Sequence, residues 1–133
     1  MTTSHAGLAR WHEYMERGAD PTLLAALIAD DAVFHSPVVH TPQAGKAVVM
    51  AYLLAAAQVL GNDSFRYTRE LVDGDQTMLE FVTEIDGIAI NGVDIIRFDD
   101  KGRITDFKVM VRPLKAINKV WETMAAQLQA AKG

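Results

Sequence analysis

A carboxylate in the middle of a predicted strand is the first residue whose type and position could do chemistry. In the segment 91–98, residue alternation puts Asp94 on one face with Ile96 and Phe98. Aspartate is depleted in strands. If that face lines an apolar hollow, desolvation raises the pKa of Asp94, and the neutral acid can donate a hydrogen bond. The structural alternative is that Asp94 pairs with a nearby arginine or accepts from a backbone N–H.

Histidine and serine are the other side chains that could take part in chemistry. His12 follows Trp11 in a largely apolar helical stretch. Its imidazole ring is either packed in the core with one nitrogen hydrogen-bonded, or it faces the hollow. No pair among the four histidines has the i, i+4 spacing of a helical zinc site, and there are no cysteines, so we predict no metal site. Ser36 lacks the small-residue elbow of a nucleophilic serine, which favours a capping or pocket-wall role.

Composition bounds the class of protein. The chain has 133 residues, 13 Lys+Arg against 17 Asp+Glu, and a net charge of −4, which argues against a nucleic-acid binder. It contains no glycine-rich phosphate loop, so we predict no nucleotide and no cofactor. No run of ~18 apolar residues and no leader-like start are present, so we expect no membrane association and a cytoplasmic location. We expect one domain over residues 1–133.

The first half of the chain is predicted to be mostly helical. Asp20 is a good N-cap, and Pro21 suits the first position of the helix that follows it. The spacing of apolar residues predicts helices over 6–18, from Pro21 through Ile28, and over 46–60, with a short strand at 32–36 and a loop at 37–45.

In the second half the period of the apolar residues changes to two. Asp-Gly turns separate the segments, which is typical of antiparallel hairpins. This pattern predicts strands over 65–72, 76–85, 88–98 and 103–111, followed by a helix from Pro113. The chain is therefore predicted to be α+β: a cone-shaped, curved antiparallel sheet with the helices packed on its concave face.

Three stretches resemble the nuclear-transport-factor-2-like superfamily, the cystatin-like roll that includes ketosteroid isomerase and the SnoaL-like polyketide cyclases. The stretch from Leu24 to Val33 resembles the family's short helix and first strand. The stretch from Asp94 to Ile104 resembles its penultimate hairpin, and Met110 to Ile117 resembles the last-strand exit of the SnoaL-like branch. The resemblance covers nearly the whole chain. It indicates a fold, whereas the reaction must be argued from the site.

The comparison with ketosteroid isomerase assigns roles to three residues. The general-base aspartate of that family, just before a proline, falls on Ser36, and the oxyanion-hole tyrosine falls on His12. The protonated aspartate that donates a hydrogen bond to the substrate falls on Asp94. Serine cannot act as a base near neutral pH without a group that takes its proton. The resemblance thus leaves Asp94 and His12 as the catalytic acid/base pair of a cyclase or dehydratase.

These residues predict a binding site and leave its use open. Strand alternation and the resemblance together predict that one cavity is lined by Phe34, Ser36, Tyr52, Phe81, Asp94, Phe107 and Val109. The ligand is expected to be a small apolar molecule. One interpretation is cofactor-free proton transfer on a carbonyl compound, of the isomerase, cyclase or dehydratase type. A second is a non-catalytic binding module, and a third is an interaction domain that dimerises through its open sheet face. The outer sheet face is a candidate homodimer interface, with Met78, Val82, Val93, Ile95 and Met110 among charged residues.

Overall fold

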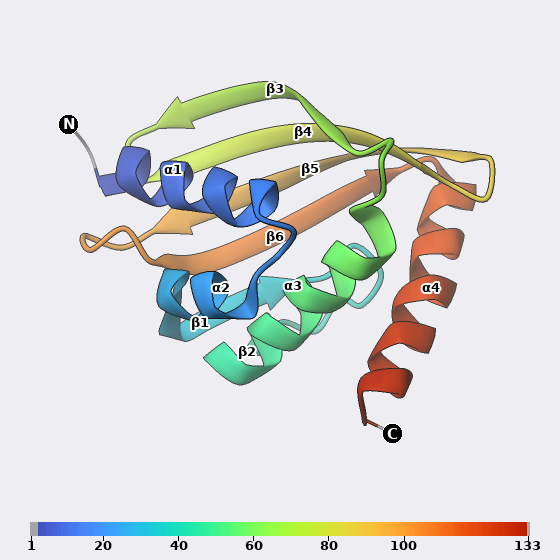
Figure 1. The fold of residues 1–133 in the computed structure, drawn as a ribbon, viewed down its shortest axis with the longest axis horizontal. Coiled ribbons are helices and arrows are strands. Elements are labelled where there is room, and N and C mark those ends of the chain that lie inside the picture. Colours follow the sequence, from blue (N-terminus) through green and yellow to red (C-terminus); the bar gives the residue numbers. More distant parts are fainter. Residues whose placement is uncertain (1–2, 133) are drawn as a thin grey trace.

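A curved six-stranded sheet carries the helices on its concave side (Figure 1). The computed structural model describes residues 3–132. The elements in chain order are α1 (Thr3–Glu16), α2 (Pro21–Leu27), β1 (Ile28–His35), β2 (Gln43–Ala44), α3 (Lys46–Leu60), β3 (Arg66–Asp73), β4 (Gln76–Ile85), β5 (Ile88–Phe98), β6 (Ile104–Arg112) and α4 (Leu114–Lys132). The α+β class is confirmed. No helix in this part of the chain has the length and hydropathy needed to cross a membrane.

The sheet contains the predicted meander and two pairings that were not predicted. One joins β1 antiparallel to the short β2, in a segment that was predicted to be a loop. Strands β3, β4, β5 and β6 pair in succession and antiparallel, as expected. On the far side of β6, however, β1 pairs with it in parallel, so the whole sheet is mixed rather than antiparallel. The two strands are about 70 residues apart in sequence, and local periodicity carries no information on such a pairing.

The boundary between α2 and β1 differs from the prediction. The start of α2 is as expected, because the Asp20 side chain accepts from the Thr22 N–H at 2.8 Å and Pro21 is the first helical residue. The helix then ends at Leu27, and Ile28 is already extended and paired with Ile104 of β6. Sheet pairing therefore overrides a local pattern that fits a longer helix.

The core lies between the concave face of the sheet and the helices. Along β4 and β5, burial alternates residue by residue, and Leu79, Phe81, Ile96 and Phe98 are almost completely buried. Gly92 belongs to the same face. A Cβ atom at Gly92 would lie 2.3 Å from the Phe81 ring, so the missing side chain lets that ring lie close over β5. Two positions further along this face is Asp94.

A β-bulge in β3 decides which of its side chains face the helices. Tyr67 pairs with Phe81, but the register shifts before Arg69, which pairs with Glu80. Simple alternation would put Tyr67 and Leu71 on the same face. The extra residue instead leaves Tyr67 facing inward while Leu71 is exposed on the outer face beside Met78.

Candidate functional site

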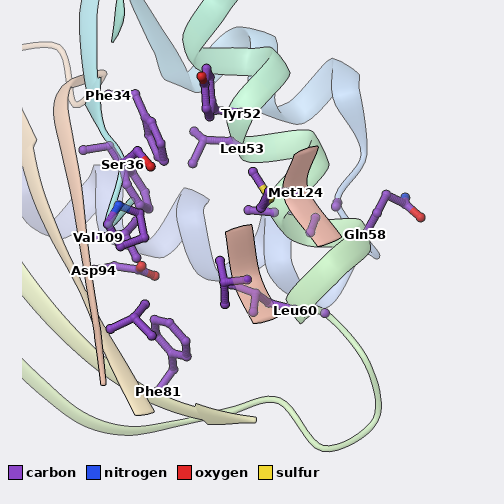
Figure 2. Close-up of a pocket in the computed structure, with 18 of the residues that line it drawn as sticks. Phe34, Ser36, Tyr52, Leu53, Gln58, Leu60, Phe81, Asp94, Val109 and Met124 are labelled. Carbon is purple, nitrogen blue, oxygen red and sulfur yellow. The ribbon is translucent and has the colours of Figure 1, made fainter. Parts of the chain in front are cut away.

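A cavity of about 400 Å³ lies between the concave face of the sheet and helices α1, α3 and α4. In Figure 2 the Asp94 carboxyl group points from the sheet into this space, with Leu60 and Met124 on the helical side. The structure brings together at this cavity all seven residues that the sequence predicted to line it: Phe34, Ser36, Tyr52, Phe81, Asp94, Phe107 and Val109. That these residues bind a ligand stays a prediction.

Asp94 is the only carboxyl group among the described residues that line the cavity. Its neighbours across the sheet are Leu79 on β4 and Val109 on β6, and its side chain is 7% exposed. Burial in these apolar surroundings raises the pKa of Asp94 from its ordinary value of 3.8 to about 7, against a hydrogen bond from Tyr67 that lowers it. Near neutral pH the neutral acid and the carboxylate are therefore both populated.

A short hydrogen-bond chain holds the Asp94 carboxyl group. The indole Nε1–H of Trp11 donates to the Tyr67 hydroxyl at 3.0 Å, and that hydroxyl donates to Asp94 Oδ2 at 2.8 Å. Burial, reinforced by Asp94, raises the pKa of Tyr67 well above its ordinary range, so the phenol remains a donor. No hydrogen bond joins Oδ1 of Asp94 to any other described residue. This oxygen is the one available to a bound molecule.

His12 does not face Asp94, so this part of the predicted pair is wrong. His12 Nε2 lies 2.7 Å from Glu70 Oε1, both side chains are partly exposed, and His12 is not among the residues that line the cavity. The reason is the bulge in β3, which leaves Glu70 paired with Leu79 and therefore on the face turned toward α1. The neighbour that reaches Asp94 is Tyr67.

Ser36 shapes the cavity wall at the end of β1. Its hydroxyl oxygen accepts from the backbone N–H groups of Val38 at 3.0 Å and Val39 at 3.2 Å. These contacts hold the turn through Pro37, which also lines the cavity. The geometry fits the capping role predicted for Ser36, and no base lies on this turn in the position that the ketosteroid isomerase resemblance assigns to aspartate.

Two tyrosines of the site were missed in the sequence. Tyr67 follows Phe65 in an alternating segment, and that alternation was the available signal, but it could not reveal the bulge. Tyr14 comes three residues after Trp11 and its ring lies 5.0 Å from the Trp11 ring, at the helical spacing of a buried face. Burial raises the pKa of Tyr14 to about 12, so it stays neutral.

The remaining titratable pairs do not form a second centre. His35 Nε2 lies 2.8 Å from Asp106 Oδ1, and both side chains are partly exposed. Among residues 3–132, no three His, Asp or Glu side chains come together in a way that could hold a metal ion.

A curved sheet with helices over its concave face and a deep apolar cavity is the architecture of the nuclear-transport-factor-2-like superfamily. Within it, the chain belongs to the SnoaL-like domain family, whose sequence profile matches residues 8–107. Among curated proteins, no sequence matches this chain.

Solved structures agree with this assignment. A steroid delta-isomerase from Pseudomonas aeruginosa is 40% identical, with a TM-score of 0.91 over 98% of this chain and 95% of that chain. A protein with a cystatin-like fold from Silicibacter pomeroyi DSS-3 is 33% identical, with a TM-score of 0.84 over 92% and 85%. A protein of unknown function from Mesorhizobium loti, 22% identical, shares the fold with a TM-score of 0.71 over 84% and 92%.

Proposed function

We propose that the protein binds a small, mostly apolar carbonyl compound in this cavity and that Asp94 exchanges a proton with it, without a cofactor. The observation that carries the proposal is a single carboxyl group with a pKa of about 7, set in an apolar cavity of about 400 Å³ with one oxygen free. A group that titrates near the working pH serves as donor and as acceptor with little driving force lost in either direction.

The two protonation states have different tasks. Neutral Asp94 donates from Oδ1 to the carbonyl oxygen of the ligand. Ionised Asp94 takes a proton from the carbon next to the carbonyl: the C–H bond breaks, its electron pair delocalises onto the carbonyl oxygen, and the O–H bond forms on the carboxyl group. Return of that proton to another atom of the ligand completes an isomerisation. The Tyr67 hydrogen bond fixes the carboxyl group throughout.

The similarity to a steroid delta-isomerase supports an apolar carbonyl ligand. Ser36 supports a different proton path, because the base that the ketosteroid isomerase resemblance expects there is replaced by a hydroxyl that accepts from Val38 and Val39. In this proposal Asp94 is the acid and the base in turn.

A non-catalytic binding module is the second candidate function, and a specific observation favours it. Apart from Asp94 and the tyrosines, no titratable side chain is among the described residues that line the cavity. With no second acid or base, the neutral Asp94 carboxyl would be a fixed hydrogen-bond donor that selects ligands with an oxygen atom.

Exchange of ligand protons for deuterium separates these candidates. We expect the protein to bind a cyclic ketone such as cyclohexanone and to accelerate deuteration of its α-carbon in D₂O, followed by NMR. Asp94→Asn should abolish the acceleration, and His12→Gln, outside the cavity, should retain it. Binding without acceleration would favour the binding module, and no binding of any apolar carbonyl compound would refute both.

We also propose that the protein is a homodimer and that the outer face of the sheet is its interface. Met78 and Met110 are exposed there and line a groove that also contains charged residues of both signs. Arg69 lies 3.3 Å from Glu80, and Arg112 Nε donates a hydrogen bond to Asn91 Oδ1. A face with both signs can be complementary to a copy of itself about a two-fold axis. Sedimentation should show a dimer that Met110→Glu dissociates. A monomeric wild-type protein would refute this interface.

A further inference from the structure

The cavity has an exposed tryptophan in its lining. Trp121 on α4 lines the cavity and is nevertheless 56% exposed. The preceding residue, Val120, is buried in the core. The two residues therefore lie on different faces of α4, and the Trp121 side chain lies at the boundary with solvent. No ring stacks on Trp121 among the described residues, whereas Trp11 contacts both Tyr14 and Phe107. A large indole is therefore left in water at the mouth of an apolar cavity.

The lining changes character between the sheet and this mouth. The carboxyl group of Asp94, which has one oxygen free, is almost completely buried on the sheet wall, and the buried Tyr14 hydroxyl in the same lining also has no hydrogen-bond partner. Most of the partly or fully exposed lining residues are apolar, among them Val38, Val39, Trp121, Met124, Ala125 and Leu128, and the polar ones are Ser36, Tyr52, Gln58 and Tyr67. In Figure 2, Met124 and Gln58 lie on the opposite side of the space from Asp94. The site therefore has a deep polar end and an apolar outer end.

We infer that the ligand is elongated, with its carbonyl group at Asp94 and an apolar chain or ring system that extends to the mouth and covers Trp121. This inference rests on the proposed function and names its ligand class. Trp121 then determines specificity for length: a short ligand fills only the deep end, and a long one buries the exposed indole. Each further methylene group removed from water tightens binding about fourfold, which corresponds to roughly 0.8 kcal/mol.

A homologous series of methyl ketones, from 2-butanone to 2-dodecanone, tests the inference by calorimetry or ligand-observed NMR. For the wild-type protein, affinity should rise about fourfold per methylene group and level off once the chain has passed the mouth. Trp121→Ala should leave the short ketones unchanged and weaken the longest ones about tenfold or more. Trp121→Phe should restore part of that loss.

The matched control is Leu114→Ala. Leu114 is on the same helix and is 72% exposed, but it is not part of the cavity lining, so its removal should change no affinity in the series. Thermal melting should show that all three variants fold, because both positions are exposed.

The outcomes separate this inference from the proposed function. Asp94→Leu, which removes the hydrogen-bond donor, should weaken short and long ketones by the same factor, because it acts on the common end. If that holds and Trp121→Ala leaves the chain-length dependence unchanged, the proposed function stands and the inference is overturned. A dimer that Trp121→Ala dissociates would also overturn it, since a second copy would then cover the indole. If no ketone binds to the wild-type protein, both fail.

Discussion

Two neighbouring residues of α1 reach two residues of β3, and the two contacts have opposite characters. Trp11 donates to Tyr67, which donates to Asp94, and Trp11 and Asp94 are buried while Tyr67 is partly buried between them. His12, one residue further, pairs with Glu70 at the partly exposed edge of the same helix and strand. Polar partners are present in both places, so the difference between the two contacts lies in their access to water.

The comparison shows what makes a carboxyl group useful here. Glu70 meets a partner that can carry a charge, in contact with solvent, where such pairs contribute at most about 1 kcal/mol. Asp94 meets only a neutral hydroxyl among apolar side chains, so desolvation dominates and raises its pKa to about 7. Holding the carboxyl group in the interior without a countercharge costs folding stability once it ionises. Perturbed pKa values of this kind cluster at binding and catalytic sites, which supports the proposed function.

The largest expected effect is the pH dependence of stability at Asp94. Because the folded pKa of Asp94 is raised, the folded state holds a proton that the unfolded chain has released, and stability falls as pH rises from about 4 to about 7. Asp94→Asn avoids this loss. We expect the variant to match the wild type near pH 4 and to exceed its free energy of unfolding by roughly 4 kcal/mol at pH 8.

Denaturant unfolding of both proteins from pH 4 to pH 8 measures this difference directly, because the contributions of other titrating groups cancel. A variant that is several kcal/mol less stable than the wild type at pH 8 would contradict the account. It would show that Asp94 belongs to a stabilising ion pair.

A smaller effect is expected when Tyr67 loses its hydroxyl. Tyr67→Phe removes the donor to Asp94 and the acceptor of Trp11, so we expect a destabilisation of about 1–3 kcal/mol. The Tyr67 hydrogen bond lowers the pKa of Asp94, so its removal raises that pKa further and the destabilisation should be larger at pH 8 than at pH 5. Equal losses at both pH values would show that Tyr67 serves packing alone.

The smallest effect is expected at the exposed pair. His12→Ala removes the contact with Glu70, and we expect a change of less than about 1 kcal/mol that shrinks further in 0.5 M salt. Ketone binding should be unaffected, because His12 does not line the cavity. If His12→Ala weakened ketone binding as much as Asp94→Leu does, His12 would belong to the site and the contrast between the two contacts would be wrong.

Much of the fold follows from local pattern, because its central strands form from consecutive segments. Helix α3 and strands β4 and β5 have the predicted bounds, since Asp-Gly turns and strict alternation mark them clearly. The start of β1 at Ile28 and its parallel pairing with β6 could not be predicted, because both depend on a contact between distant parts of the chain.

For the site, too, local pattern predicted one part and contacts between distant segments decided the other. Alternation together with the family resemblance predicted that Asp94 faces the cavity, and the prediction holds because β5 is regular up to Arg97. The identity of its partner could not be predicted, since a single extra residue in β3 turns Tyr67 toward Asp94 and Glu70 toward His12. A bulge leaves no reliable trace in a pattern of period two, and the predicted His12–Asp94 pair failed for that reason.

The central claim is that Asp94 is a buried acid that titrates near neutral pH, and carbon-detected NMR of its carboxyl group measures this directly. With Asp94→Asn used to assign the signal, the chemical shift of Cγ should follow a titration with its midpoint near pH 7. A midpoint at or below pH 4 would contradict the account, because Asp94 would then be an ordinary ionised carboxylate, unable to donate a hydrogen bond to a ligand at neutral pH.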